Sequence, residues 1–462
     1  MKLSKNTNID LGNDKIPKIF WMYAVPSILA MLAQSTAGFI DSVFIGRYIG
    51  SDGLSAITLI MPIIMLLGGV ATMVAIGGTT LAGIHKGKEE LEKSNNYFNV
   101  TIVLLSIVAV IATIFLIALS GNFANLLGAK GEVAEFMMEY TKTLALFFLP
   151  FLLTFAFSFF LKLDGKPATV VVVILSGTVI NIILDYLLVG VLGLSMKGAA
   201  LATGISQLIP CMLMVYFIKF KSSWKFSFPV FRKKEIWAML FNGSSELLSM
   251  AAASIAGLIY NMIIIKRIGI HGVAAYAVAI QITTISTSVF YGFAEAVQSA
   301  VSFNLGADKL NRVKELRNIS IQANLASGII LCVVSLIFGE GIASIFIKDQ
   351  GTIEMAAYIL DFYAVAFVLS GVNITLATYY TAVNSPVLSG MLAVSRSLIA
   401  LGLGLIILPL IFGNQGVWMA VIFAEIATVI VGVVCMRRYA FGNLKVEKER
   451  RNILIKKTPL FK

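Results

Sequence analysis

The sequence predicts an all-α polytopic membrane protein. Three observations support this fold class: the composition, the length of the apolar segments and an internal repeat. Of the 462 residues, 58% are hydrophobic and 13% are charged, whereas about a quarter of the residues of a soluble domain are charged. The formal net charge of +12 is explained by basic loops on the cytoplasmic side of a membrane, so we expect no nucleic-acid partner.

Twelve segments are long and apolar enough to cross a bilayer, which requires about 20 such residues per helix. They lie at about residues 19–48, 54–83, 97–120, 135–161, 167–190, 197–219, 236–265, 272–302, 316–338, 354–383, 386–412 and 416–436. Five prolines inside these segments are expected to interrupt or kink the helices: Pro26, Pro62, Pro150, Pro210 and Pro409. Pro26 is the candidate helix hinge, because its segment also carries Asp41.

An internal repeat divides the twelve segments into two sets of six. At an offset of 219 residues, small residues and a proline recur: Gly38 and Gly257, Gly50 and Gly269, Gly53 and Gly272, Ala56 and Ala275, Gly87 and Gly306, Pro167 and Pro386. Because six is an even number, both sets begin on the same side of the membrane and are related by a pseudo-two-fold axis along its normal. We expect an N-terminal six-helix bundle with a cytoplasmic linker in residues 1–230 and a C-terminal six-helix bundle with a basic tail in residues 231–462. Two such bundles around a central cleft suit alternating access.

The distribution of Lys and Arg residues predicts that both termini are cytoplasmic. In that orientation, 28 of the 36 basic residues lie on the cytoplasmic side and 7 on the outer side, as the positive-inside rule requires. Arg396 is the remaining basic residue and lies inside a membrane segment. The basic tails at both ends are expected to contact lipid headgroups.

Asp41 is the only charged residue between Lys18 and Arg47, and a carboxylate at the centre of a membrane helix costs about 2.5–3.5 kcal/mol. From the helical rise per residue, Asn181, Asp185 and Thr203 lie at a depth similar to that of Asp41. Carboxylates with neutral oxygens suit a hard monovalent cation or a shared proton. We therefore interpret these four residues as a cation- or proton-coupling site, with an ordinary interhelical hydrogen-bond cluster as the alternative.

The second half of the sequence lacks this cluster. Asp41, Asp185 and Thr203 correspond there to Tyr260, Gly404 and Val421. The candidates for a substrate cavity are Glu246, Tyr260, Glu295, Arg396 and Glu425. Arg396 and Glu425 lie near the membrane midplane and are expected either to pair or to contact substrate. Glu246 is expected to attract a cation, and Glu295, near the inner end of its helix, is assigned to an inner gate or a structural role.

The sequence contains no P-loop, metal-ligand cluster or nucleophile arrangement. We therefore expect no enzyme activity and no cofactor, and the only metal ion expected is Na⁺ at the coupling site. The absence of a nucleotide site favours secondary transport, which is driven by an ion gradient.

Several segments, in this order along residues 15–440, resemble the multidrug and toxic compound extrusion (MATE) transporters, in particular their MepA-like bacterial branch. They are D-S-V-F-I-G-R-Y-I-G at 41–50, L-L-G-A-K-G-E at 126–132, D-G-K-P at 164–167, N-I-I-L-D at 181–185, K-G-A-A-L-A-T at 197–203, G-F-A-E-A-V-Q-S at 292–299 and F-N-L-G-A at 303–307. The resemblance implies a V-shaped pair of six-helix bundles in a bacterial plasma membrane. It also implies an antiporter that exports cationic or amphiphilic drugs in exchange for Na⁺ or H⁺, and we expect a monomer.

The resemblance implies a coupling site at the same four residues, Asp41, Asn181, Asp185 and Thr203. The sequence departs from many relatives at A-G-I-H-K-G-K, residues 82–88, which affects the expected contacts of the inner loop. Relatives of the NorM type use an acid in the seventh helix, but that role is not transferred to Glu246.

Two other functions compete with drug export. One is a flippase for lipid-linked intermediates, whose cavity would be cationic in order to hold an anionic head group. Here the buried parts of the membrane segments are expected to contain five acids (Asp41, Asp185, Glu246, Glu295 and Glu425) but only one base, Arg396. This excess of acids disfavours an anionic substrate. The other is a channel or a scaffold without transport activity, which the two-fold repeat disfavours.

Overall fold

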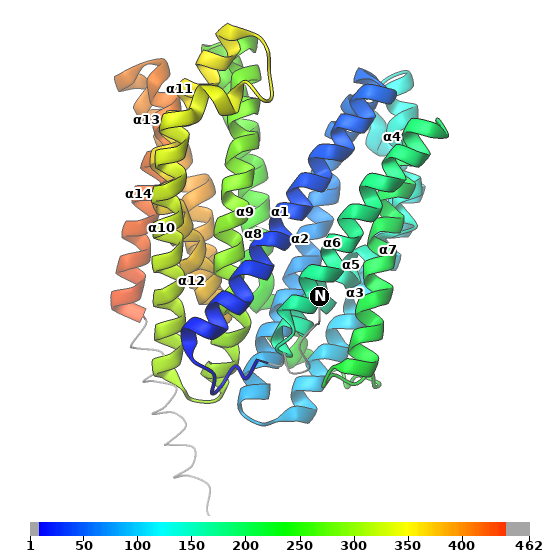
Figure 1. Ribbon diagram of the computed structural model, residues 1–462, viewed down its shortest axis with the longest axis vertical. Coiled ribbons are helices and arrows are strands. Elements are labelled where there is room, and N and C mark those ends of the chain that lie inside the picture. Colours follow the sequence, from blue (N-terminus) through cyan, green and yellow to red (C-terminus); the bar gives the residue numbers. More distant parts are fainter. Residues whose placement is uncertain (1–8, 440–462) are drawn as a thin grey trace, which may run out of the picture.

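The computed structural model describes residues 9–439, and all the regular elements within them are helices (Figure 1). In chain order these are α1 (Ile16–Tyr48), α2 (Ser51–Gly87), α3 (Leu91–Leu126), α4 (Glu132–Ala145), α5 (Phe148–Leu163), α6 (Pro167–Leu184), the π-helical turn η1 (Asp185–Val191), α7 (Ser195–Lys221), α8 (Lys233–Arg267), α9 (Ile270–Gly306), α10 (Leu310–Ala343), α11 (Gln350–Ala382), α12 (Pro386–Val394), the π-helical turn η2 (Ser395–Ile399), α13 (Ala400–Phe412) and α14 (Asn414–Tyr439). The basic C-terminal tail, which was expected to contact lipid headgroups, lies mostly outside the described residues.

The helices form two bundles, α1–α7 and α8–α14, arranged as a V (Figure 1). The bundles lie together at one end, here called the narrow end, and diverge towards the other. Helix α1 runs diagonally between them: Phe20 stacks on Phe293 of α9, with ring centroids 5.8 Å apart, and Ser35 hydrogen bonds to Ser288 of α9 at 2.7 Å. The end of α1 that carries Asp41 then lies against α7 of its own bundle. Helix α1 therefore contacts both bundles.

The predicted spans agree with the structure except in the fourth segment. Eleven spans in the described part of the chain are long and apolar enough to cross a membrane, and α4 and α5 together form a twelfth that is bent by 55°. The expectation of one helix over residues 135–161 was wrong because the chain bends between Ala145 and Phe148. Pro150 lies in the first turn of α5. Backbone N–H groups of the first turn have no acceptor within the helix, so a proline there removes no hydrogen bond.

The other four prolines do not interrupt their helices. Pro26, Pro62, Pro210 and Pro409 lie inside continuous helices, α1, α2, α7 and α13 respectively. The interruption expected from the sequence is therefore absent, since neighbouring groups in a packed membrane bundle can satisfy the backbone carbonyl that a proline leaves free.

The internal repeat is confirmed by the bounds of the helices. Helix α2 begins at Ser51 and ends at Gly87, and α9 begins at Ile270 and ends at Gly306. Both ends differ by 219 residues, and the first residues of α3 and α10, and of α6 and α12, differ by the same number.

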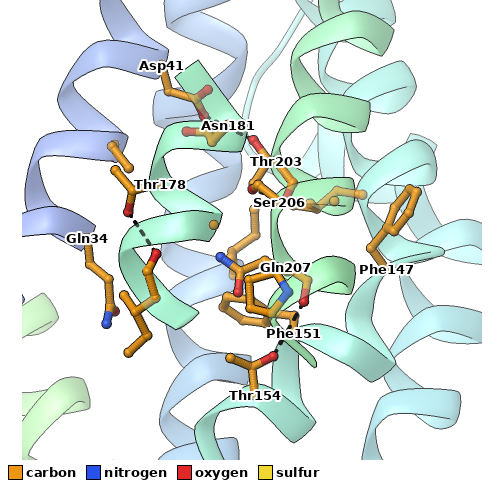
Figure 2. Close-up of a pocket in the computed structure, with 18 of the residues that line it drawn as sticks. Gln34, Asp41, Phe147, Phe151, Thr154, Thr178, Asn181, Thr203, Ser206 and Gln207 are labelled. Atoms are coloured by element: carbon orange, nitrogen blue, oxygen red, sulfur yellow. Dashed lines mark hydrogen bonds between the residues drawn. The ribbon is translucent and has the colours of Figure 1, made fainter. Parts of the chain in front are cut away.

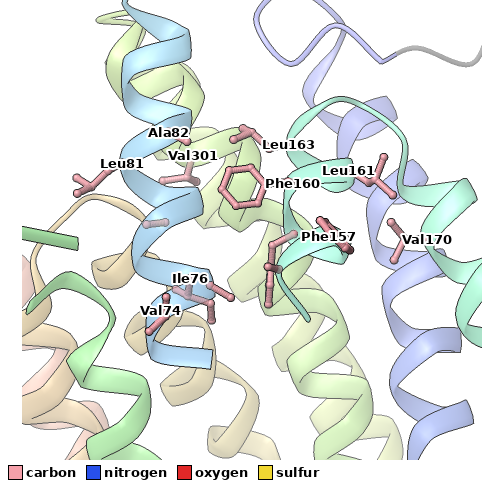
Figure 3. Close-up of a cluster of buried hydrophobic side chains, with 14 of the residues drawn as sticks. Val74, Ile76, Leu81, Ala82, Phe157, Phe160, Leu161, Leu163, Val170 and Val301 are labelled. Atoms are coloured by element: carbon pink, nitrogen blue, oxygen red, sulfur yellow. The ribbon is translucent and has the colours of Figure 1, made fainter. Parts of the chain in front are cut away.

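The narrow end is held together by a hydrophobic core that both bundles share. Val301 of α9 belongs to the same buried cluster as Ala82 of α2 and Leu163 of α5 (Figure 3). Glycines let the helices approach closely there: a side chain on Gly87 would collide with the backbone of Phe303 in α9. Close packing of this kind is typical of helix interfaces in membranes, which are rich in small residues.

The linker between the bundles is fixed to the first bundle by asparagines of α3. Asn95 accepts from the backbone N–H group of Lys225 at 2.8 Å and donates to its carbonyl oxygen at 2.9 Å. Asn96 forms the same pair of hydrogen bonds with Val230, at 2.8 and 3.0 Å. Asn99 accepts from the N–H group of Ser227 at 2.9 Å. The linker is thus bound to α3 as far as Val230.

Candidate ion site and substrate cavity

The structure brings the four residues of the predicted coupling site together. The Thr203 hydroxyl in α7 donates to Asp41 Oδ2 in α1 at 3.1 Å. Asp185 and Asn181 are buried and close enough to interact with Asp41. Asn181 lies in the last turn of α6, and Asp185 is the first residue of η1; such π-helical turns are frequent at functional sites. Figure 2 shows Asp41, Asn181 and Thr203 grouped at one end of a cavity.

Three of the four carboxylate oxygens of this site lack a hydrogen-bond donor in the described part of the chain. Asp41 Oδ1 and both side-chain oxygens of Asp185 are buried and have no hydrogen-bond partner among the described residues. Two adjacent carboxylates cannot both be ionised without a large cost. A proton shared between them, or a monovalent cation held by their oxygens, would remove this cost. The oxygens present therefore fit either Na⁺ or H⁺.

The cavity next to this site has a volume of about 290 Å³ and lies inside the first bundle. Four phenylalanines line it: Phe147, Phe148, Phe151 and Phe155. Polar side chains such as Gln34 and Gln207 also line it (Figure 2). An apolar cavity with a few polar groups is the usual form of a site for a small organic molecule. Because Asp41 also lines it, the cavity has its acidic group at one end.

The sequence interpretation missed Gln34 and Gln207, although the sequence contained a signal for both. Gln34 precedes Asp41 by seven residues, and Gln207 follows Thr203 by four. Both intervals place the two residues of a pair on the same face of a helix. A search for polar residues at these intervals around the predicted ion site would have found them.

The equivalent position in the second bundle is filled by aromatic side chains. Tyr260 stacks on Tyr276 with ring centroids 5.0 Å apart, and its hydroxyl donates to the carbonyl oxygen of Val417 at 2.6 Å. Its side chain is buried and lines neither of the two cavities described here. The structure therefore places Tyr260, a candidate for the substrate cavity, in a packed core instead.

Arg396 and Glu425 form an ion pair, which is one of the two alternatives that the sequence left open. The Arg396 Nε and Nη2 atoms lie 2.8 and 2.7 Å from Glu425 Oε1. Ser370 and Asn373 donate to the same carboxylate at 2.7 and 2.6 Å. The carboxylate of Glu425 is thus fully engaged by groups of its own bundle.

A second, smaller cavity of about 30 Å³ lies beside this ion pair. Arg396 lines it together with Glu246, Tyr291 and Asn373. Within residues 9–439, Glu246 has no basic partner and accepts only a long hydrogen bond, of 3.4 Å, from Thr381. The structure therefore places Glu246 at a cavity, as the sequence predicted.

Glu295 pairs with a lysine of the other bundle, Lys162, which was counted only among the basic residues of the cytoplasmic side. Lys162 lies in the last turn of α5, and its Nζ atom lies 2.9 Å from Glu295 Oε2 in α9. The backbone carbonyl oxygen of Lys162 also accepts a hydrogen bond from the hydroxyl of Tyr23 at 2.6 Å. The comparison of five acids with one base in the membrane segments did not include Lys162, which is buried in the structure. No sequence signal could have paired two residues 133 positions apart on different bundles.

Comparisons with known proteins support this description. A family model described as MatE matches residues 26–187 and 246–406. The chain is 25% identical over 402 residues to the multidrug export protein MepA of Staphylococcus saprophyticus, and the match covers 86% of each chain. It is also 25% identical over 418 residues to MepA of Staphylococcus aureus strain NCTC 8325, covering 88% of this chain and 90% of the relative.

Solved structures of low sequence identity share the fold. The crystal structure of a MATE protein in complex with MaL6 has a TM-score of 0.89 and 19% identity, over 97% of this chain and 100% of the other. The outward-facing conformation of a multidrug resistance MATE transporter has a TM-score of 0.87 and 21% identity, over 94% and 98%. At these identities the likeness supports the V-shaped arrangement of the helices alone.

Proposed function

Because the chain belongs to the MatE family, we propose that this integral membrane protein is a secondary active efflux transporter that exchanges cationic or amphiphilic compounds for Na⁺ or H⁺. The names of the relatives, multidrug export proteins, support the export of small drugs. The observation that carries the proposal is the position of Asp41, which belongs to the ion site and also lines the adjacent cavity. An ion and an organic cation would therefore compete for the same charge.

In the proposed mechanism, ion binding draws α1 towards η1 and α7. A proton or Na⁺ arriving between Asp41 and Asp185 relieves their repulsion, so the two carboxylates can approach each other. The movement of α1 reshapes the cavity, and the organic cation loses the negative charge of Asp41. Pro26 in α1 is the hinge that we propose for this movement, since a proline removes one backbone hydrogen bond of its helix.

Alternating access follows if the narrow end faces the cytoplasm, as the distribution of basic residues predicts. The structure would then be open to the outside. We further propose that the protein acts as a monomer, without a cofactor, in a bacterial plasma membrane, with both termini in the cytoplasm.

The charges of the cavities favour this function over a flippase for lipid-linked intermediates. Lys162 and Arg396 are paired with Glu295 and Glu425, whereas Asp41, Asp185 and Glu246 form no ion pair in the structure. The groups left without a counter-charge are therefore acidic, and an anionic head group would be repelled.

Purified protein in liposomes can test the proposal. Ethidium movement is measured under an imposed Na⁺ gradient and, separately, under an imposed H⁺ gradient. We expect one of the gradients to drive ethidium against its own gradient, and Asp41→Asn to abolish this movement. If neither gradient drives any cation, the antiport proposal is wrong.

A further inference from the structure

The buried ion pair between Lys162 and Glu295 joins the two bundles near the narrow end. Lys162 belongs to α5 of the first bundle, and Glu295 belongs to α9 of the second. The side chains are only 6% and 13% exposed, so little water screens the interaction. Any separation of the bundles at this end must break the pair and leave both charges without a partner.

Glu295 is close to the smaller cavity of the second bundle. Tyr291 lines that cavity and lies one helical turn before Glu295, so the two side chains are on the same face of α9. Glu246, on α8, lines the same cavity and is close enough to Glu295 for the two charges to interact. Tyr291, Glu246 and Glu295 thus form one acidic and aromatic group.

The charge of this group depends on the first bundle. The second bundle supplies three acids here, Glu246, Glu295 and Glu425, and one base, Arg396, which is bound to Glu425. Lys162 supplies the second base. When the bundles separate at the narrow end, Lys162 leaves with α5, and the group becomes more acidic by one charge as it becomes accessible.

From this geometry we propose that Glu295 and Glu246 form a binding site for lipophilic organic cations in the second bundle, which the ammonium group of Lys162 occupies in the present conformation. This proposal rests on the proposed function and names the place where the substrate binds from the cytoplasmic side. The substrate cation takes the position of the lysine ammonium, and the ring of Tyr291, which is partly exposed, supplies a cation–π contact. When the bundles close again, Lys162 returns to Glu295 and displaces the cation.

Lys162 therefore acts as an internal competitor of the substrate, because Glu295 cannot bind the lysine and the substrate cation together. A purely structural ion pair would show no such competition. The two interpretations differ in what happens when the two charges are exchanged between the bundles.

The experiment measures equilibrium binding of tetraphenylphosphonium to the full-length protein in nanodiscs, with the neutral dye Nile red as a control ligand. We expect Glu295→Gln to weaken tetraphenylphosphonium binding about tenfold, which is the usual loss of affinity when one hydrogen bond or contact to a charged group is removed. Lys162→Gln should strengthen it several-fold, because the competitor is removed. Nile red binding should change in neither variant.

The exchange variant Lys162→Glu with Glu295→Lys decides between the two interpretations. It keeps an ion pair between the bundles but places the base on the second bundle, so we expect it to lose tetraphenylphosphonium binding while its unfolding temperature stays near that of the wild type. Binding equal to that of the wild type would overturn the proposal. If the exchange variant does not fold, Lys162→Gln is compared with the double variant Lys162→Gln with Glu295→Gln, and equal affinities would overturn it.

The outcome for the wild type separates this inference from the proposed function. Normal binding and gradient-driven export of tetraphenylphosphonium, together with an unchanged affinity in Glu295→Gln, would reject the site and leave the function standing. Failure of the wild type to bind or export any cation would reject both.

Discussion

Gly87 of α2 packs against the backbone of Phe303, and Gly306, the residue 219 positions after Gly87, packs against the backbone of Ile84. Phe303 also follows Ile84 by 219 positions, so the two contacts are one contact repeated by the pseudo-two-fold axis. A β-carbon on either glycine would collide with the carbonyl oxygen that faces it. The narrow end is thus closed by a pair of equivalent contacts that tolerate no side chain.

The first prediction concerns these glycines. Gly87→Ala or Gly306→Ala should weaken the closed narrow end by about 1–3 kcal/mol, the usual cost of overpacking, and shift the protein towards the conformation that is open there. The buried Ser302, replaced by cysteine, serves as the reporter, and its rate of reaction with a maleimide should rise in both variants. Gly402→Ala is the matched control, because the added carbon would meet no atom within 4 Å beyond its chain neighbours and the backbone of its own helix. Equal rates in all variants would show that the contacts do not hold this end closed.

The second prediction uses the repeat as an internal control for ion coupling. Asp41→Asn keeps the size of the side chain but removes its charge, so gradient-driven export should be abolished and binding of the organic cation should weaken, while expression remains. Tyr260→Phe, at the equivalent position, should leave coupling unchanged and cost only about 0.5–1.5 kcal/mol of stability for the lost hydrogen bond to Val417. Transport is measured in liposomes under an imposed gradient. Normal export by Asp41→Asn would reduce the four-residue cluster to a structural network.

The third prediction concerns the ion pair of the second bundle. Glu425→Leu leaves the guanidinium of Arg396 without its partner and should destabilise the protein by about 3–5 kcal/mol, whereas replacing both residues by apolar ones should recover much of the loss. Thermal unfolding of the purified protein measures the effect. Lys18→Ala is a control, since its pair with Asp14 is partly exposed and worth about 0–1 kcal/mol. Unchanged stability with loss of transport would instead assign Arg396 and Glu425 to substrate contact.

The fourth prediction compares cross-links at the two ends of the V. A cross-link between Arg47→Cys and Lys266→Cys holds the diverging ends together and should stop transport. A disulfide between Gly83→Cys and Ser302→Cys is feasible because the two β-carbons would lie about 3.1 Å apart before adjustment, against about 3.5–4.5 Å in disulfides. It should also stop transport, but with the cavity of the first bundle still open.

Labelling of Gln34→Cys by a membrane-impermeant maleimide added from outside distinguishes the two trapped states. The reaction should proceed with the narrow end locked and fail with the diverging ends locked. Full transport activity with either cross-link complete would contradict the rocking movement of the bundles.

The membrane spans and the repeat could be predicted because both leave long-range regularities in the sequence. Pro150 was expected to interrupt or kink the fourth segment, but the place of the bend, between Ala145 and Phe148, could not be predicted, since residues 144–149 are a continuous apolar run with no glycine or proline. Pro26 and Pro210 were expected to interrupt or kink their helices, and both helices continue through them. A proline signal is local, but whether a helix continues through it depends on neighbouring helices that the sequence does not reveal.

The grouping of the four first-bundle residues could be predicted because depth in a membrane follows directly from the position along a helix. Asp41 and Thr203 could be aligned in this way without any knowledge of packing. Depth does not determine the direction in which a side chain points, and for this reason Tyr260 was wrongly expected at a cavity. The pairing of Lys162 with Glu295 also depends on how the two bundles are rotated relative to each other, which no local pattern records.

The asparagine contacts of the linker set a mechanical limit on any rearrangement. Val230 is bound to Asn96 through both of its backbone polar groups, and α8 begins at Lys233. Three steps between consecutive α-carbons span at most about 11 Å, so the first residue of α8 must stay within that reach of its anchor on α3. The start of α8 therefore stays close to α3. The narrow end can open only by a rotation of the second bundle about this point, and the gap is widest on the side farthest from the linker.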